Sequence, residues 1–85
     1  MGLISRLHKG KKVVGFKQTR KAVCRSDTEA VFLAEDADPE LTGALEQLCL
    51  ERKVPVERLA SMKELGALCG ISVGASAAAL LKEET

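Results

Sequence analysis

The chain has 85 residues, of which 46% are hydrophobic, so it is long enough for one small domain and too apolar to be disordered. Two Phe and no Trp or Tyr exclude a platform of aromatic rings for stacking nucleic-acid bases. The formal net charge of +1 hides an asymmetry: residues 1–25 carry eight Lys or Arg and no acid, whereas residues 26–85 carry five basic and twelve acidic residues. This distribution favours a basic face for an anionic partner, although an ordinary solvated basic stretch remains an alternative.

The cysteines predict neither a metal site nor a disulfide framework. Cys24, Cys49 and Cys69 form no CxxC pair, and His8 is the only histidine. We expect Cys49 and Cys69 to be small buried residues, no cofactor, and a reduced, cytoplasmic setting. The first twelve residues lack the apolar core of a signal peptide, and the longest apolar stretch, residues 71–81, is too short to span a bilayer.

Hydrophobic spacing in the N-terminal half predicts helix, strand, helix and strand in turn. A short helix covers Leu3, Ile4 and Leu7 and ends at Gly10. A short strand at residues 13–14 leads through Gly15 into a helix over residues 17–25. One side of that helix carries Phe16, Thr19, Ala22 and Val23, and another carries Lys17, Gln18, Lys21 and Arg25. Residues 29–34 (EAVFLA) form a β-branched and aromatic run that predicts a buried strand.

The C-terminal half repeats the alternation. Asp38 and Pro39 are typical of a helix start, and an apolar face follows at Leu41, Ala44, Leu45, Leu48 and Cys49. Residues 54–59 predict a short strand, which Pro55 places at a sheet edge. Residues 61–64 form a capping box. That helix has its apolar side at Met62, Leu65, Leu68 and Cys69 and ends at Gly70. Residues 76–81 predict a central strand.

The predicted order αβαβαβαβ indicates an α/β protein with a sheet covered by helices on both faces. We expect a single domain over residues 1–85. The acidic residues at 35–38 follow a predicted strand, where they could bind Mg²⁺, but a helix cap within a solvated loop explains them better.

The segment from Gly15 to Lys21 is the most informative local feature. Gly15 allows the turn from strand to helix, and Lys17, Gln18 and Lys21 then share an exposed face near a helix N-terminus. Helix amides together with lysines favour phosphate, and the Gln18 amide can read a base edge. An ordinary solvated face is the alternative. The apolar loop over residues 71–75 either exposes Ile71 and Val73 or folds them into the core.

Three segments taken in order resemble the kink-turn RNA-binding family of large-subunit ribosomal proteins, the seven-Ae and thirty-e group. They are VVGFKQTRKAV, LAEDADPELTGALEQLCLERKVP and SMKELGALCGISVGASAAAL, and the resemblance spans about residues 13–81. The sequence resembles the small bacterial, Firmicutes-type members of the family most. It implies a three-layer α/β/α sandwich with a mixed four-stranded sheet, and recognition of RNA in which a three-nucleotide bulge adjoins tandem sheared G·A pairs.

The resemblance also implies the site residues. The family motif G-x-N-E-x-x-K falls on residues 15–21, where Gly15 and Lys21 match, Lys17 replaces Asn and Gln18 replaces Glu. The second contact of the family is the apolar loop before the last strand. The implied RNA-binding residues are therefore Gly15, Phe16, Lys17, Gln18, Lys21, Arg25, Ile71, Ser72, Val73, Gly74 and Ala75. Splayed, unpaired bases are the usual targets of sequence-specific RNA readout, which suits this pairing of basic helix and apolar loop.

The main hypothesis is a non-enzymatic, monomeric, cytoplasmic protein that recognises and stabilises kink-turn RNA, associated with the ribosome or another ribonucleoprotein and not with membranes. One alternative is a ribosome-associated protein-interaction module that docks through the acidic helix face around Glu46 and Glu51. Another is a small enzyme that uses Glu35, Asp36 or Cys24, although no base, nucleophile and oxyanion set can be assembled.

Overall fold

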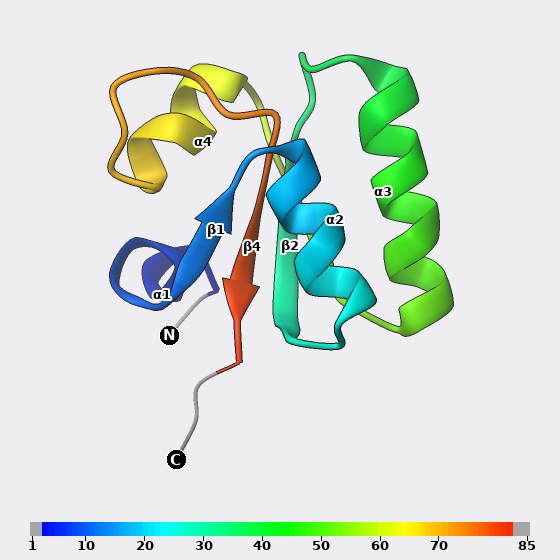
Figure 1. Cartoon of the computed structure of the whole chain (residues 1–85). Coiled ribbons are helices and arrows are strands. Elements are labelled where there is room, and N and C mark those ends of the chain that lie inside the picture. Colours follow the sequence, from blue (N-terminus) through cyan, green and yellow to red (C-terminus); the bar gives the residue numbers. More distant parts are fainter. Residues whose placement is uncertain (1–2, 83–85) are drawn as a thin grey trace.

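The computed structural model describes residues 3–82, which form a four-stranded sheet between two layers of helices (Figure 1). The elements in order are α1 (Leu3–Lys9), β1 (Lys12–Val14), α2 (Phe16–Cys24), β2 (Thr28–Ala34), α3 (Pro39–Arg52), β3 (Val56–Leu59), α4 (Met62–Leu68) and β4 (Ala77–Leu81). The predicted alternation of helices and strands is confirmed throughout. Among the described residues, no helix is both long and apolar enough to cross a membrane.

The sheet is mixed and has the strand order β1-β4-β2-β3. Strand β4 runs antiparallel to both β1 and β2, whereas β2 and β3 are parallel. The prediction of a central last strand is confirmed, and β3 with Pro55 before it lies at an edge. A register shift between Thr28 and Ala30 interrupts the pairing of β2 with β4.

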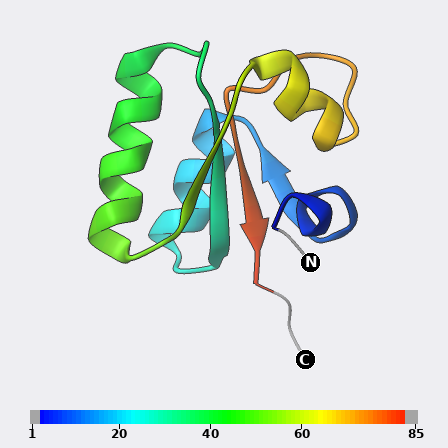
Figure 2. The ribbon, with the colours of Figure 1, turned by 180° about the vertical axis from the view of Figure 1, so that it is seen from behind.

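Two hydrophobic clusters, one on each face of the sheet, account for the helix layers. Leu7, Leu65 and Cys69 bring α1 and α4 against one face, centred on the buried Phe32. Val23, Leu45 and Cys49 bring α2 and α3 against the other. Figure 2 shows the same arrangement from behind, with α1 and α4 on one side of the strands and α2 and α3 on the other. The chain is therefore the three-layer α/β/α sandwich that was expected.

Three details differ from the sequence predictions. In α3, Leu41 and Ala44 are exposed, whereas Thr42 is buried, so the inward stripe is narrower than the apolar pattern suggested. Met62 is likewise at the surface of α4. Strand β3 begins at Val56 instead of residue 54, because the Val54 amide donates to the carbonyl of Cys49 (2.8 Å) and closes the end of α3.

Candidate nucleic-acid interface

Gly15 makes the turn from β1 into α2. Its φ of 106° and ψ of 156° are costly for any residue with a Cβ. Its amide donates to the carbonyl of Ala77 at the start of β4 (2.8 Å), and its carbonyl accepts from the Thr19 amide (3.0 Å). Gly15 therefore joins the beginning of α2 to the beginning of β4.

Helix α2 has a buried side and a cationic side, as its sequence predicted. Thr19, Ala22 and Val23 are buried. The exposed residues are Lys17, Gln18, Arg20, Lys21, Cys24 and Arg25. No acidic residue lies in the first turn. The amides at this N-terminus and the cations beside them can act together on a phosphate group.

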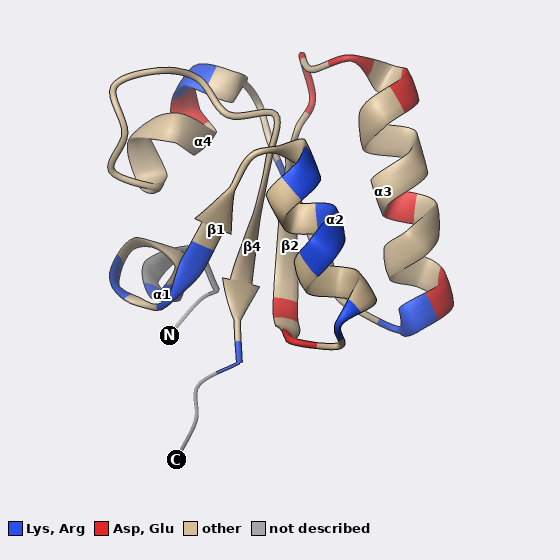
Figure 3. Cartoon of the chain, in the orientation of Figure 1, with Lys and Arg blue, Asp and Glu red and all other residues tan. Residues whose placement is uncertain are grey.

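The cations line a shallow surface hollow of about 400 Å³. Its lining consists of Lys17, Arg20, Lys21, Cys24 and Arg25. Figure 3 shows the basic residues along α2, whereas α3 and the connection before it carry most of the acids on this side of the molecule. From Lys17 to Arg25 the helix rises by about 12 Å, so Arg25 lies at the opposite end of α2 from the Gly15 turn. We call this basic surface the α2 stripe.

The loop between α4 and β4 presents apolar side chains to solvent. Val73 is 68% exposed and Ile71 is 37% exposed. The loop therefore exposes these two side chains and does not fold them into the core. Ser72 and Gly74 are also exposed, whereas Ala75 is buried. Exposed apolar side chains on a short loop are suited to covering an unpaired base.

Helix α4 holds this loop in shape. The Ala75 amide donates to the carbonyl of Met62 (3.0 Å), and the Ile71 amide donates to the carbonyl of Gly66 (3.0 Å). A Cβ on Gly66 would lie only 2.1 Å from the carbonyl oxygen of Val73, so glycine is what allows helix and loop to come this close.

The structure thus brings the two predicted segments to one end of the sheet. The hydrogen bond from Gly15 to Ala77 connects the start of α2 to the strand that follows the loop. In Figures 1 and 2 the loop and the start of α2 lie at the same end of β4. We refer to these two segments together as the helix–loop face. Arg25 is the one predicted residue that lies away from it.

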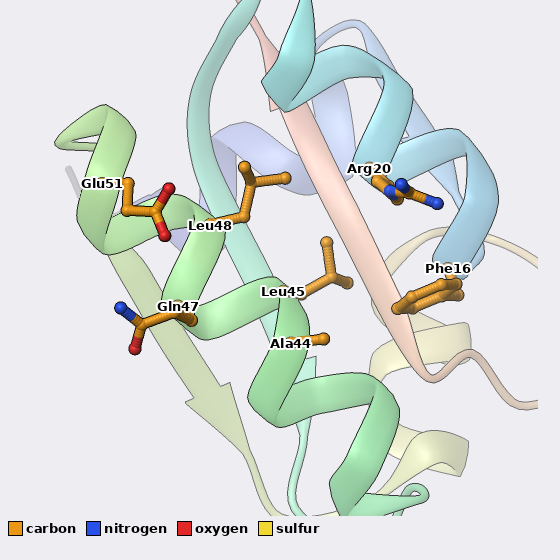
Figure 4. A pocket seen from close by; sticks show the side chains of 7 residues that line it. All are labelled: Phe16, Arg20, Ala44, Leu45, Gln47, Leu48 and Glu51. Carbon is orange, nitrogen blue, oxygen red and sulfur yellow. The ribbon is translucent and has the colours of Figure 1, made fainter.

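Beside the stripe, a groove of about 350 Å³ separates α2 from α3 (Figure 4). Its lining is Phe16, Arg20, Ala44, Leu45, Gln47, Leu48 and Glu51. The ring of Phe16 is half-buried here and packs with the α2–α3 cluster. Sequence reasoning missed this groove, because it depends on the spacing between two helices.

Two of the three acidic residues that follow β2, Asp36 and Asp38, are occupied as helix caps. The Asp38 carboxylate accepts from the Glu40 amide (3.0 Å) at the start of α3. The Asp36 carboxylate accepts from the Met62 amide (2.7 Å) at the start of α4. Within residues 3–82, no group of three or more His, Cys, Asp or Glu side chains could hold a metal ion.

The two buried thiols, Cys49 and Cys69, have raised pKa values. Burial, reinforced by the nearby Glu46 carboxylate, raises the pKa of Cys49 to about 11. Burial also raises the pKa of Cys69, although Lys12 opposes the effect. Both therefore stay protonated at neutral pH. On the acidic helix face, Glu46 pairs with Arg58 of β3, and Glu51 is exposed.

Comparison with known proteins places this architecture in a class of nucleic-acid-binding α/β domains. The structure of a Giardia lamblia protein, titled a 15.5kD RNA binding protein, superposes with a TM-score of 0.88 at 30% identity, over 96% of this chain and 72% of that one. An RNA-binding protein of Bacillus pumilus is 44% identical over 69 residues, which are 81% of this chain and 84% of that protein. One from a Geobacillus species is 43% identical over 76 residues, 89% and 93% of the two chains.

A family model described as the ribosomal protein L7Ae/L30e/S12e/Gadd45 family matches residues 2–85. The chain belongs to this family, as the sequence resemblance had indicated.

Proposed function

We propose that the chain is an RNA-binding protein that recognises and stabilises kink-turn RNA. The observation that carries this proposal is the meeting of the cationic start of α2 and the exposed apolar loop at one end of the sheet, joined through the hydrogen bond from Gly15 to Ala77. The names of the two bacterial relatives and of the Giardia protein support RNA as the ligand. The protein works as a monomer in the cytoplasm, on ribosomal or other structured RNA, and carries out no catalysis.

The two halves of the helix–loop face do different work. Lys17 and Lys21 hold backbone phosphates, and the amides of the first turn of α2 add partial positive charge. The Gln18 amide can donate to and accept from base edges. Ile71 and Val73 cover an extruded base and shield it from water. Because the kinked RNA places phosphates and an unpaired base at these points together, binding shifts the RNA towards the kinked state.

The acidic-face alternative has weaker support. Glu46 is engaged with Arg58, so it offers less charge to a partner than the sequence suggested. Four exposed cations, in contrast, are gathered along α2 and at its end: Lys17, Arg20, Lys21 and Arg25. The observations therefore favour RNA over a protein partner.

The deciding experiment is a pair of titrations. One RNA carries a three-nucleotide bulge followed by tandem G·A pairs, and its control has those pairs replaced by Watson–Crick pairs. We expect the first to bind at least tenfold more tightly, a difference of about 1.4 kcal/mol. Equal affinities would refute kink-turn recognition.

Gln18 provides a finer test of the same proposal. Gln18→Ala should reduce the affinity ratio between the two RNAs more than it reduces binding to the control. An unchanged ratio would show that Gln18 reads no base.

A further inference from the structure

A second basic hollow lies at the other end of the sheet from the helix–loop face. It has a volume of about 230 Å³ and sits where α2 and α3 end, β2 begins and β4 finishes; we call it the far-end pocket. It is lined by Val23, Ser26, Thr28, Glu29, Arg52, Lys53, Val54, Pro55 and Lys82. Sequence reasoning did not predict it, since its residues come from three separate stretches of the chain.

The far-end pocket is positively charged. Three cations line it: Arg52 and Lys53 at the end of α3, and Lys82 just after β4. Among the described residues that line it, Glu29 is the only acid, and the Glu29 carboxylate is paired with Arg6 of α1. The local field therefore attracts an anion.

The pocket also holds a buried hydroxyl without a partner. Thr28 is 4% exposed, and its Oγ1 is one of two buried side-chain polar atoms that form no hydrogen bond among the side chains that the structure describes. Buried polar groups usually have a hydrogen-bond partner, so a buried hydroxyl without one needs an explanation. Thr28 lies at the register shift between β2 and β4, and irregularities of this kind commonly re-aim a side chain at a functional site.

The ends of α2 and α3 form the backbone of the pocket. Ser26 (φ 58°) and Lys53 (φ 59°) are the two non-glycine residues with positive φ in the described part of the chain, and both line this pocket. Glycine is the residue that suits this conformation, and a side chain kept there costs stability. Both residues belong to helix-ending turns, since the Asp27 amide donates to the carbonyl of Ala22 (3.1 Å) and the Val54 amide donates to that of Cys49 (2.8 Å).

Helix-end electrostatics explain part of this arrangement. Cations stabilise helix C-termini, and Arg52 donates to the carbonyl of Cys24 at the end of α2 (3.3 Å). They do not explain the unsatisfied Thr28 hydroxyl. Three cations with two hydroxyls form a donor set that matches a phosphate group.

The α2 stripe leads to this pocket, since Arg25 is its last cation and Ser26 follows directly. We propose that the far-end pocket binds a backbone phosphate of the RNA stem that extends from the kink-turn along α2. This inference rests on the proposed function for its ligand. It enlarges the RNA footprint from one end of the sheet to both.

The first test uses inorganic phosphate and is independent of kink-turn recognition. In an NMR titration of the whole chain, phosphate should shift the amide signals of Ser26, Thr28 and Lys53. Chloride at equal ionic strength should leave them in place. No phosphate-specific shift at these residues would overturn the proposal.

The second test uses Lys53→Gly, with Lys9→Ala as the control of equal charge change outside the pocket. Glycine relieves the positive φ, so Lys53→Gly should raise the unfolding temperature while it weakens binding to a long-stem kink-turn RNA by about threefold to tenfold. Its salt dependence should fall by about one phosphate contact. An RNA whose stem stops short of the pocket should bind both variants as tightly as the wild type.

The outcomes separate this inference from the proposed function. If Lys53→Gly binds the long-stem RNA like wild type while Lys21→Ala weakens it, the far-end contact is refuted and the helix–loop face stands. If phosphate shifts the pocket signals but stem length makes no difference, the pocket serves a free phosphate compound and the RNA assignment is overturned.

Discussion

Gly66 offers a sharp test of how the apolar loop is held. A Cβ at this position would lie 2.1 Å from the carbonyl oxygen of Val73, 3.1 Å from its carbonyl carbon and 3.2 Å from the Cα of Gly74. All three are backbone atoms, so no side-chain rotation relieves the contact. The contact must lengthen from 2.1 Å to at least 3.4 Å, by 1.3 Å or more, before ordinary van der Waals distances return.

Gly66→Ala therefore combines two opposing effects on stability. Overpacking costs about 1–3 kcal/mol, whereas replacing a helical glycine by alanine gains about 1 kcal/mol. We expect a net destabilisation of about 0–2 kcal/mol and a folded protein. We expect a larger effect on RNA affinity. Displacing Val73 removes about 1–2 kcal/mol of apolar contact with the RNA, which lowers the affinity roughly fivefold to thirtyfold.

The assay is titration with kink-turn RNA at several salt concentrations, together with thermal unfolding. The lost contact is apolar, so affinity should fall while its salt dependence stays unchanged. Gly43→Ala is the matched control, because no atom lies within 4 Å of a Cβ there and Gly43 is exposed on α3. It should stabilise the helix and leave binding unchanged. Wild-type RNA affinity in Gly66→Ala would refute the reasoning.

Three further predictions concern the stripe, the loop and the buried thiol. Lys21→Ala should weaken kink-turn binding and lower the salt slope by about one contact; an unchanged slope in a titration series would exclude a phosphate partner for Lys21. Val73→Asp should impair RNA binding with little change in unfolding temperature, because the side chain is 68% exposed; wild-type affinity would mean that the loop does not touch RNA. The pKa of Cys49 is raised from 9.0 to about 11, so the unfolded chain loses this proton first and stability should fall as pH rises from 9 to 11. Denaturant unfolding should show a shallower alkaline loss in Cys49→Ala, and equal losses would contradict the assignment.

Local signals in the sequence were enough to predict the order of elements. The Asp38–Pro39 start of α3 and the Ser61 cap of α4 depend on residues a few positions apart, and the structure has both. The all-apolar run before Lys82 predicted a central strand because a strand covered on both faces has no polar side. The helix–loop face followed from the same local logic and from the family resemblance.

Features that depend on distant partners could not be predicted in this way. Asp36 caps a helix 26 residues further along the chain, so its role is invisible before the fold is known. Leu41 is exposed although it continues the apolar pattern of α3, because burial depends on which neighbours pack against the helix. The far-end pocket likewise requires the pairing of β2 with β4.

The central position of β4 has a consequence for synthesis. Strand β1 and α2 leave the ribosome early, but β1 pairs with β4, which is made last of the eight elements. Until β4 inserts between β1 and β2, the carbonyl of Ala77 is not there to receive the Gly15 amide, and the loop has no fixed place beside α2. Long-range pairings of this kind slow folding. A nascent chain therefore displays its basic helix well before the helix–loop face is assembled, and under the proposed function selectivity for kinked RNA would arise only when the sheet closes.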